Sequence, residues 1–176
     1  MLPVCHMFAY CLMKNHFHIF VRVKSAKELR QLWANSKTQA QLTGEKLVLK
    51  TSKAFSNLFS SYTQAFNKVY DRMGSLFIPS MKTEYVEGDE AFKRVVHYIH
   101  ANPVHHGFVS KMNMWKHSSY NIFLNNQETN LERAYVLNVF GGLEKFLEYH
   151  SKPIELRRSS DSSQSCTYPF IDLDNF

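Results

Sequence analysis

The chain has 176 residues, of which 44% are hydrophobic and 20% are charged, a composition that supports a buried core and excludes a wholly disordered chain. No stretch reaches the ~18 consecutive apolar residues of a membrane span, and the first residues lack the features of a signal peptide, so we expect a cytoplasmic protein with no membrane partner. Lys and Arg number 21 against 15 Asp and Glu, and the resulting charge of +6 favours an acidic partner without identifying it.

A β-hairpin followed by a short helix is predicted for the start of the chain. Residues 4–12 and 17–23 are rich in β-forming side chains, with a short turn between them. Ser25 and Glu28 have the spacing of a capping box, in which each side chain bonds to the other residue's backbone N–H. We therefore expect a helix over about residues 26–33.

A long amphipathic helix is predicted next. Aromatic and aliphatic residues recur at helical spacing over residues 52–70, and Gly74 has the position of a glycine that ends a helix. Beyond it, residues 76–78 and 83–86 are rich in β-forming side chains on either side of Pro79, which indicates two short strands.

The second half of the chain is predicted to be mainly helical. Apolar residues lie on one face of a helix over residues 89–101, and Asn102-Pro103 is expected to end it, because proline disfavours helical geometry in the residue before it. Two shorter helices over residues 131–140 and 143–149 follow. Taken with the hairpin, this order of elements predicts an α+β fold.

One domain is expected over residues 1–150. After this point the composition changes to a run rich in serine and charged side chains. Such a composition is typical of a flexible tail, which we expect over residues 151–176.

Two histidines in the predicted hairpin form the first candidate site. His16 and His18 are two positions apart, so in a strand their side chains project to the same side, ~6.5–7 Å apart along the chain. Neutral imidazole is the commonest protein ligand for metals, and two rings placed in this way can converge on one divalent ion. The alternative is an ordinary exposed or hydrogen-bonded pair, since a His-x-His pattern alone has low specificity.

Tyr98 and Asn102 form the second candidate site. On a helix they are i,i+4 neighbours on one flank of the apolar stripe, and Arg94 lies one turn before Tyr98. A tyrosine hydroxyl can act as a nucleophile, and an amide oxygen can complete a metal site built on two histidines. The alternative is a half-buried tyrosine whose hydroxyl binds water and an asparagine that caps the helix end.

Basic and aromatic residues form a third, more scattered group. Basic side chains can neutralise phosphates and flat rings can stack on unpaired bases, although such residues most often form a solvated surface. The candidates are Lys82, Lys93, Arg94, Lys111, Lys116, Trp115 and Tyr120.

Two motifs resemble those of a known enzyme family. Residues 9–18 (AYCLMKNHFH) resemble the His-hydrophobic-His (HUH) strand of single-tyrosine transposases, which are the insertion-sequence 200-like enzymes and their REP-associated relatives. Residues 98–104 (YIHANPV) resemble the tyrosine helix of the same family. Shorter matches fit the family at the expected places, so that the resemblance covers most of residues 4–150; they lie at residues 66–67, 74–77 and 115–120.

The resemblance implies a metal-dependent DNA strand-transfer enzyme with a ferredoxin-like βαββαβ core, an antiparallel sheet flanked by helices, that often dimerises. In this family the two strand histidines hold Mg²⁺ or Mn²⁺, which polarises a scissile phosphate in single-stranded or hairpin DNA. By the same resemblance His16, His18 and Asn102 would be metal ligands, and attack by Tyr98 would leave a 5′-phosphotyrosine link and a free 3′-hydroxyl. The candidates for DNA contact are Lys82, Lys93, Arg94 and Trp115.

The same resemblance predicts a shortened N-terminus. Family members carry a strand and a helix before the segment equivalent to residues 2–4, so the first strand and helix of the core are expected to be missing here. An alternative function follows from this expectation, namely a catalytically impaired DNA-binding remnant or regulator of the same family. A third interpretation, an unrelated α+β domain that binds a small anion, requires the order of the motifs to be a coincidence.

Overall fold

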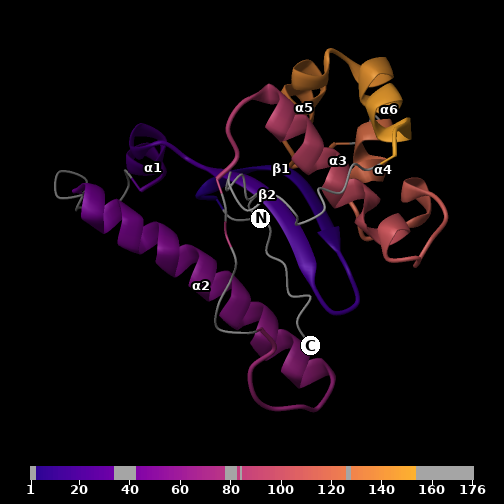
Figure 1. The fold of residues 1–176 in the computed structure, drawn as a ribbon. Coiled ribbons are helices and arrows are strands. Elements are labelled where there is room, and N and C mark those ends of the chain that lie inside the picture. The colour runs from indigo at the N-terminus through magenta and orange to yellow at the C-terminus, as the bar shows by residue number, and fades with distance from the viewer. Residues whose placement is uncertain (1–2, 34–42, 78–82, 84, 126–127, 154–176) are drawn as a thin grey trace, which may run out of the picture. The chain divides into compact units, whose positions relative to one another are not determined.

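The computed structural model describes residues 3–33, 43–77, 83, 85–125 and 128–153 (Figure 1). Within these residues the chain forms a two-stranded antiparallel sheet, six α-helices and one 3-10 helix, which confirms the predicted α+β class. The elements are β1 (Cys5–Leu12), β2 (Phe17–Val23), α1 (Ala26–Leu32), α2 (Gly44–Val69), α3 (Asp89–His105), η2 (Met112–Met114), α4 (Tyr120–Leu124), α5 (Arg133–Phe140) and α6 (Leu143–Ser151). No helix in this part of the chain is long and apolar enough to cross a membrane.

The chain divides into two compact units. The first unit comprises Met1–His6 with Arg22–Ser80 and contains α1 and α2. The second unit comprises Met7–Val21 with Met81–Phe176, and contains most of the hairpin and the helices from α3 to α6. The single domain expected over residues 1–150 stays a prediction.

In the first unit, the capping box predicted at the start of α1 is present. Glu28 Oε2 accepts hydrogen bonds from the Ser25 backbone N–H at 2.8 Å and from the Ser25 hydroxyl at 2.6 Å, and this hydroxyl accepts one from the Glu28 N–H at 3.3 Å. His6 contacts the other carboxylate oxygen at 3.0 Å. The bonds from Ser25, with the contribution of His6, lower the pKa of Glu28 to about 2, so the cap stays charged in mild acid.

The helix α2 begins earlier than the sequence indicated, at Gly44 instead of near residue 52. Its first two turns contain Leu47 and Thr51, which are the buried residues of the helix. Leu47 and Thr51 continue the face of the apolar stripe toward the N-terminus by i,i+4 steps. The residues next to them are polar or exposed, so the helical spacing is not evident from the sequence.

The end of α2 also differs from the prediction. Tyr70 caps the helix, and Asp71 takes the left-handed conformation (φ 47°) that we expected at Gly74. Aspartate tolerates this conformation because its short polar side chain can bond locally. Gly74 lies in the following turn with φ 95°, where its carbonyl accepts a hydrogen bond from Asn67 Nδ2 at 2.9 Å.

The two short strands predicted around Pro79 are wrong for the residues that the structure describes. Those residues lie in bends or irregular segments: Leu76, Phe77, Thr83, Tyr85 and Val86. The rest of both predicted strands lies outside the described residues. Phe77 packs its ring against Phe59 and Tyr62 of α2, at centroid distances of 5.2 and 6.0 Å, so it is covered without joining a sheet.

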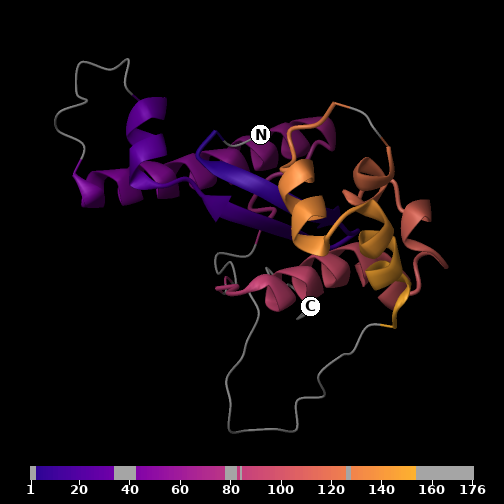
Figure 2. The ribbon, with the colours of Figure 1, turned by 90° about the horizontal axis from the view of Figure 1, so that it is seen from above.

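In the second unit, the hairpin packs on α3 around a cluster of aromatic rings. Phe8 of β1, Phe20 of β2 and Phe92 of α3 have ring centroids 4.9 to 5.3 Å apart in tilted or edge-on arrangements. The helices α5 and α6 pack against α3 and against each other (Figure 2). Buried side chains from the hairpin and from α3 to α6 form one continuous core.

The helix α3 continues past the residues at which the sequence predicted its end. It passes through Asn102 and Pro103 and ends at His105, where the His106 N–H still donates to Asn102 O at 3.0 Å. Both Asn102 and Pro103 are fully buried, so their packing outweighs the preference of the residue before proline for extended geometry. Asn102 is therefore held at a regular helical position, one turn after Tyr98.

The two predicted C-terminal helices are confirmed as α5 and α6. Gly141 ends α5 in the left-handed conformation, with φ 82°. The sequence did not predict η2 or α4, because 3 and 5 residues are too few for a periodic pattern. Nearly all of the predicted tail, from residue 154 onward, lies outside the described residues.

A short stretch before α4 pairs with β1. The Leu12 N–H donates to His117 O, and the Ser119 N–H donates to Tyr10 O, both at 2.9 Å. A single antiparallel bridge joins Cys11 to Ser118. This pairing fixes the segment that contains Trp115 and Ser119 against the hairpin.

Candidate active site

His16 and His18 lie side by side at the turn of the hairpin. A hydrogen bond from the Met13 N–H to His16 O at 2.8 Å closes the turn, and His16 directly precedes β2, so strand alternation puts its side chain on the same side as that of His18. Their ring centroids are 5.0 Å apart, and the side chains are only 4% and 1% exposed. The pair is therefore buried and not an exposed surface feature.

Asn15 sets the protonated nitrogen of His16. Its Oδ1 accepts a hydrogen bond from His16 Nδ1 at 2.9 Å. Because an amide oxygen can only accept, Nδ1 carries the proton and Nε2 keeps its lone pair. Nε2 is thus the nitrogen of His16 that is able to bind a metal ion.

The helix α3 brings Asn102 and Tyr98 to His18. Asn102 Nδ2 donates to His18 Nε2 at 2.9 Å, and the Asn102 side chain is fully buried. The Tyr98 ring lies edge-on to the His18 ring, with centroids 5.6 Å apart and an angle of 82°. The structure therefore brings together the four residues that the sequence singled out, all within the second unit.

The donor atoms of this cluster suit a divalent cation. Asn102 Oδ1 is buried and has no hydrogen-bond partner in the described part of the chain. Two ligands bound at ~2.1 Å in octahedral geometry lie ~3 Å apart. The 2.9 Å between the Asn102 amide and His18 Nε2 matches this spacing, and a half-turn of the amide exchanges its nitrogen for its oxygen.

The same residues define which ligand types are present. Among the described residues, no group of three His, Cys, Asp or Glu surrounds a common point. The candidate set is therefore two imidazoles and one amide. A divalent ion held by these three side chains would complete its coordination with water and substrate phosphate.

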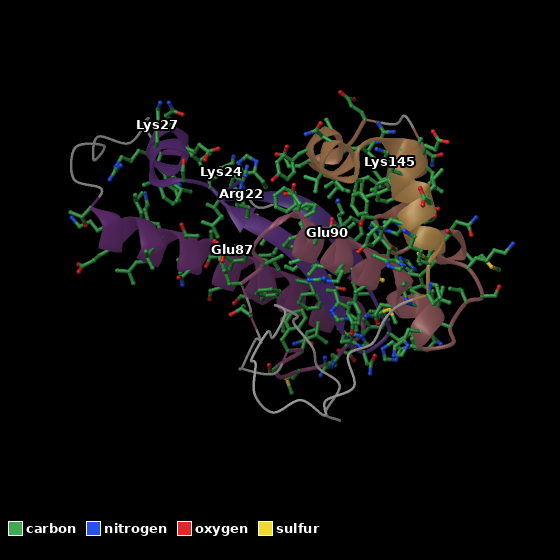
Figure 3. The ribbon with its side chains drawn as sticks, turned by 45° about the horizontal axis from the view of Figure 1, so that its top comes forward. Arg22, Lys24, Lys27, Glu87, Glu90 and Lys145 are labelled. Atoms are coloured by element: carbon green, nitrogen blue, oxygen red, sulfur yellow. The ribbon has the colours of Figure 1, made fainter. Side chains whose placement is uncertain are left out.

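The predicted DNA-contacting residues on α3 lie in different places. Arg94 is exposed and lies one turn before Tyr98 on the same flank. Lys93 Nζ pairs with Glu90 Oε1 at 2.8 Å, and this bond raises the pKa of Lys93; Glu90 lies near the start of α3 (Figure 3). At 100° per residue, Lys93 points ~140° away from Tyr98, so the structure does not bring it to the histidines.

The other two DNA-contacting candidates are Lys82 and Trp115. Lys82 lies outside the described residues. Trp115 is half-buried and its Nε1–H donates to Leu12 O at 2.9 Å, which holds the indole beside the hairpin.

His106 is a neighbour of the candidate site that the sequence did not reveal. Its ring centroid lies 5.4 Å from that of His16. The signal was present, because His106 follows Asn102 by one helical turn. Because the helix was expected to end before Asn102, the His105-His106 pair was interpreted as part of a loop that makes surface contacts.

A second group of histidines is buried away from the hairpin turn. His150 Nδ1 donates to Phe146 O at 2.8 Å, so its Nε2 accepts from His100 Nδ1 at 3.0 Å, and His100 Nε2 accepts from the Ser119 hydroxyl at 2.8 Å. The His97 ring lies 5.0 Å from the His150 ring. This network joins α3, α6 and the stretch before α4, and the three imidazoles are neutral in the folded protein.

We expect this network to make the second unit sensitive to acid. Burial lowers the pKa of His97 to about 4 and that of His150 to about 3, and it lowers the pKa of His100 well below its usual range. The folded state therefore resists protonation, whereas the unfolded chain binds protons below its ordinary histidine pKa of about 6.5. The free energy of unfolding is therefore highest above about pH 6.5 and decreases as the pH falls below this value. At about pH 5 the decrease is about 2 kcal/mol for each of His97 and His150.

Urea unfolding at about pH 7.5 and about pH 5 measures this loss. In the variant His97→Gln the difference between the two pH values should shrink, whereas His105→Gln, at an exposed histidine of the same helix, should leave it unchanged. Equal unfolding free energies at both pH values in the unmodified chain would contradict the prediction.

Comparison of the chain with models of protein families, with curated proteins and with solved structures found no match. A function for this chain therefore has to be inferred from its sequence motifs and from the geometry of the site.

Proposed function

We propose that the chain is a metal-dependent single-tyrosine nuclease and transposase of the HUH class that acts on single-stranded and hairpin DNA. The observation that carries the proposal is the meeting of His16 and His18, from the hairpin, with Tyr98 and Asn102, from α3. These residues lie in the two segments that resemble the HUH strand and the tyrosine helix.

The proposal includes a ferredoxin-like core. An antiparallel hairpin packed on a helix, with a further stretch bridged to β1, is compatible with part of such a sheet. The cytoplasmic location and a homodimer belong to the same proposal.

The chemistry follows from the residues present. Tyr98 Oη attacks the phosphorus of the scissile phosphate, forms the Oη–P bond and releases its proton to solvent. The bond from phosphorus to the 3′-oxygen breaks, and this oxygen leaves as a hydroxyl after taking up a proton. The 5′ end of the DNA stays linked to Tyr98, so the bond energy is retained for rejoining.

The remaining residues orient the phosphate and hold the cation. His16, His18 and Asn102 would bind Mg²⁺ or Mn²⁺, which when bound stabilises the negative charge that develops on the phosphate. Burial of the three side chains keeps their donor atoms fixed before the substrate arrives. Arg94, on the flank of Tyr98, adds a positive charge for the DNA backbone.

The proposal is tested by incubating the full chain with a labelled single-stranded hairpin DNA and Mn²⁺. We expect a protein–DNA adduct that survives denaturation and that does not form in EDTA. Binding of the DNA without any adduct would instead favour the catalytically impaired DNA-binding alternative. A chain that neither binds nor cleaves the DNA would exclude both functions.

Asn15 should act on metal binding through His16. Asn15→Ala removes the acceptor that keeps the proton on His16 Nδ1, so part of the population places the proton on the metal-binding nitrogen. We expect Mn²⁺ affinity, measured from the electron paramagnetic resonance signal of the free ion, to fall about 10-fold. Asn15→Asp, which retains an acceptor, should restore it, and unchanged affinity in Asn15→Ala would exclude this role for Asn15.

A further inference from the structure

A row of three rings extends from the candidate active site along the end of α3. His106, Phe108 and Trp115 have nearly parallel planes, with angles of 19° and 22° between neighbours and centroid distances of 6.2 and 5.7 Å. The His106 ring lies 5.4 Å from the ring of His16. The row therefore begins at a residue in contact with the proposed metal site.

The backbone at the end of α3 holds Phe108 in this row. Gly107 takes a positive φ of 70°, its N–H donates to Val104 O at 3.0 Å, and the Phe108 N–H donates to Pro103 O at 2.9 Å. This is the Schellman motif, in which the side chain after the glycine commonly packs back on the helix. Phe108 nevertheless stays 38% exposed, so the residue is accessible from solvent.

The hairpin holds the row through one backbone carbonyl and one side chain. Trp115 Nε1–H donates to Leu12 O at 2.9 Å, which sets the plane of the indole. Lys14 Nζ lies 4.9 Å from the centroid of the Phe108 ring and brings a positive charge to it. The rings are thus ordered before any ligand binds, which lowers the entropic cost of stacking on them.

The sequence around the row is basic and contains no acidic side chain. Residues 91–127 include four Lys or Arg and no Asp or Glu, and residues 7–21 of the hairpin include Lys14 and no Asp or Glu. Both segments belong to the second unit. Flat rings with the ammonium group of Lys14 beside them suit a ligand that is both aromatic and anionic, and unpaired nucleotides combine these properties.

We infer that His106, Phe108 and Trp115 form a stacking site for an unpaired base of single-stranded DNA, next to the scissile phosphate. The inference rests on the proposed function for the identity of that phosphate. Stacking uses the flat face of a base and not its hydrogen-bonding edge, so the site selects unpaired over paired bases and tolerates any base sequence.

Binding of a labelled oligothymidine to the full chain, without metal and in the Tyr98→Phe background, tests this site apart from the chemistry. Phe108→Ala should weaken binding about 5- to 100-fold, and Phe108→Tyr, which keeps the ring, should bind within about twofold of the parent. Met114→Ala removes another exposed apolar side chain, 60% exposed and outside the row, and should have no effect.

Two further measurements separate base stacking from attraction to phosphate. An oligonucleotide with abasic positions should bind the parent and Phe108→Ala equally, because the phosphates remain and the bases are absent. The chain has two tryptophans, so the variant Trp33→Phe retains only Trp115. In this variant oligothymidine should quench the fluorescence of Trp115.

The outcomes distinguish the stacking site from the proposed function. Equal oligothymidine affinity in Phe108→Ala and its parent, unquenched Trp115, or no binding of the oligonucleotide overturns the stacking site. If the unmodified chain still forms the covalent adduct in that case, the proposed function stands. Stacking without any adduct supports the site and overturns the nuclease.

Discussion

Replacing Tyr98 with phenylalanine should abolish the covalent DNA adduct while DNA binding stays within about twofold of the unmodified chain. The substitution removes only the attacking oxygen and leaves the ring that packs edge-on against His18 at 5.6 Å. Because the bond from Oη to phosphorus cannot form without this oxygen, we expect adduct formation to fall at least about 10³-fold. Denaturing gel electrophoresis of labelled hairpin DNA with Mn²⁺ measures the adduct.

Tyr149 provides a matched control for this experiment. Its ring lies edge-on to His97 at 5.6 Å and 84°, almost the geometry of Tyr98 and His18, but away from the hairpin turn. Tyr149→Phe should therefore retain the adduct in full. Persistence of the adduct in Tyr98→Phe would show that Tyr98 is not the nucleophile, and equal loss in Tyr149→Phe would show that the loss does not depend on the position of the hydroxyl.

The elements that carry the candidate site were predictable because their signals are local. His16 directly precedes the strand over residues 17–23, so strand alternation places it on the same side as His18, and helical spacing places Tyr98 and Asn102 on one flank. That the two pairs would meet did not follow from either pattern. It came from the resemblance to a family in which both motifs belong to one site.

The remaining features depend on packing between distant segments, which periodicity does not encode. From the sequence, α3 was predicted to end before Asn102, because the residue before a proline prefers extended geometry. In the folded unit the burial of Asn102 and Pro103 keeps the helix intact. The hydrogen bonds of His100 with Ser119 and His150 join residues from three segments. Nothing in the sequence near any one of them indicates the other two.

Removing the imidazole of His16 should weaken the binding of the divalent cation. His16→Ala deletes one of the proposed ligands, and we expect Mn²⁺ affinity to fall at least about 100-fold, with loss of metal-dependent cleavage. Mn²⁺ should raise the melting temperature of the unmodified chain, since an ion at 100 times its Kd stabilises the folded state by about 2.7 kcal/mol. The rise should be largely lost in His16→Ala and retained in His105→Ala, at an exposed histidine of α3.

Asn102→Asp distinguishes a metal ligand from a purely structural amide. Without metal, the variant loses the N–H that donates to His18 and buries a carboxylate, so we expect it to be less stable by at least about 2 kcal/mol. With Mn²⁺, the carboxylate is the harder and stronger ligand, and the variant should bind the ion about tenfold more tightly than the unmodified chain and recover its stability. An equal loss of stability with and without Mn²⁺ would mean that Asn102 only orients His18. In that case the imidazole pair would have no oxygen ligand from α3, and the proposed metal site would fail.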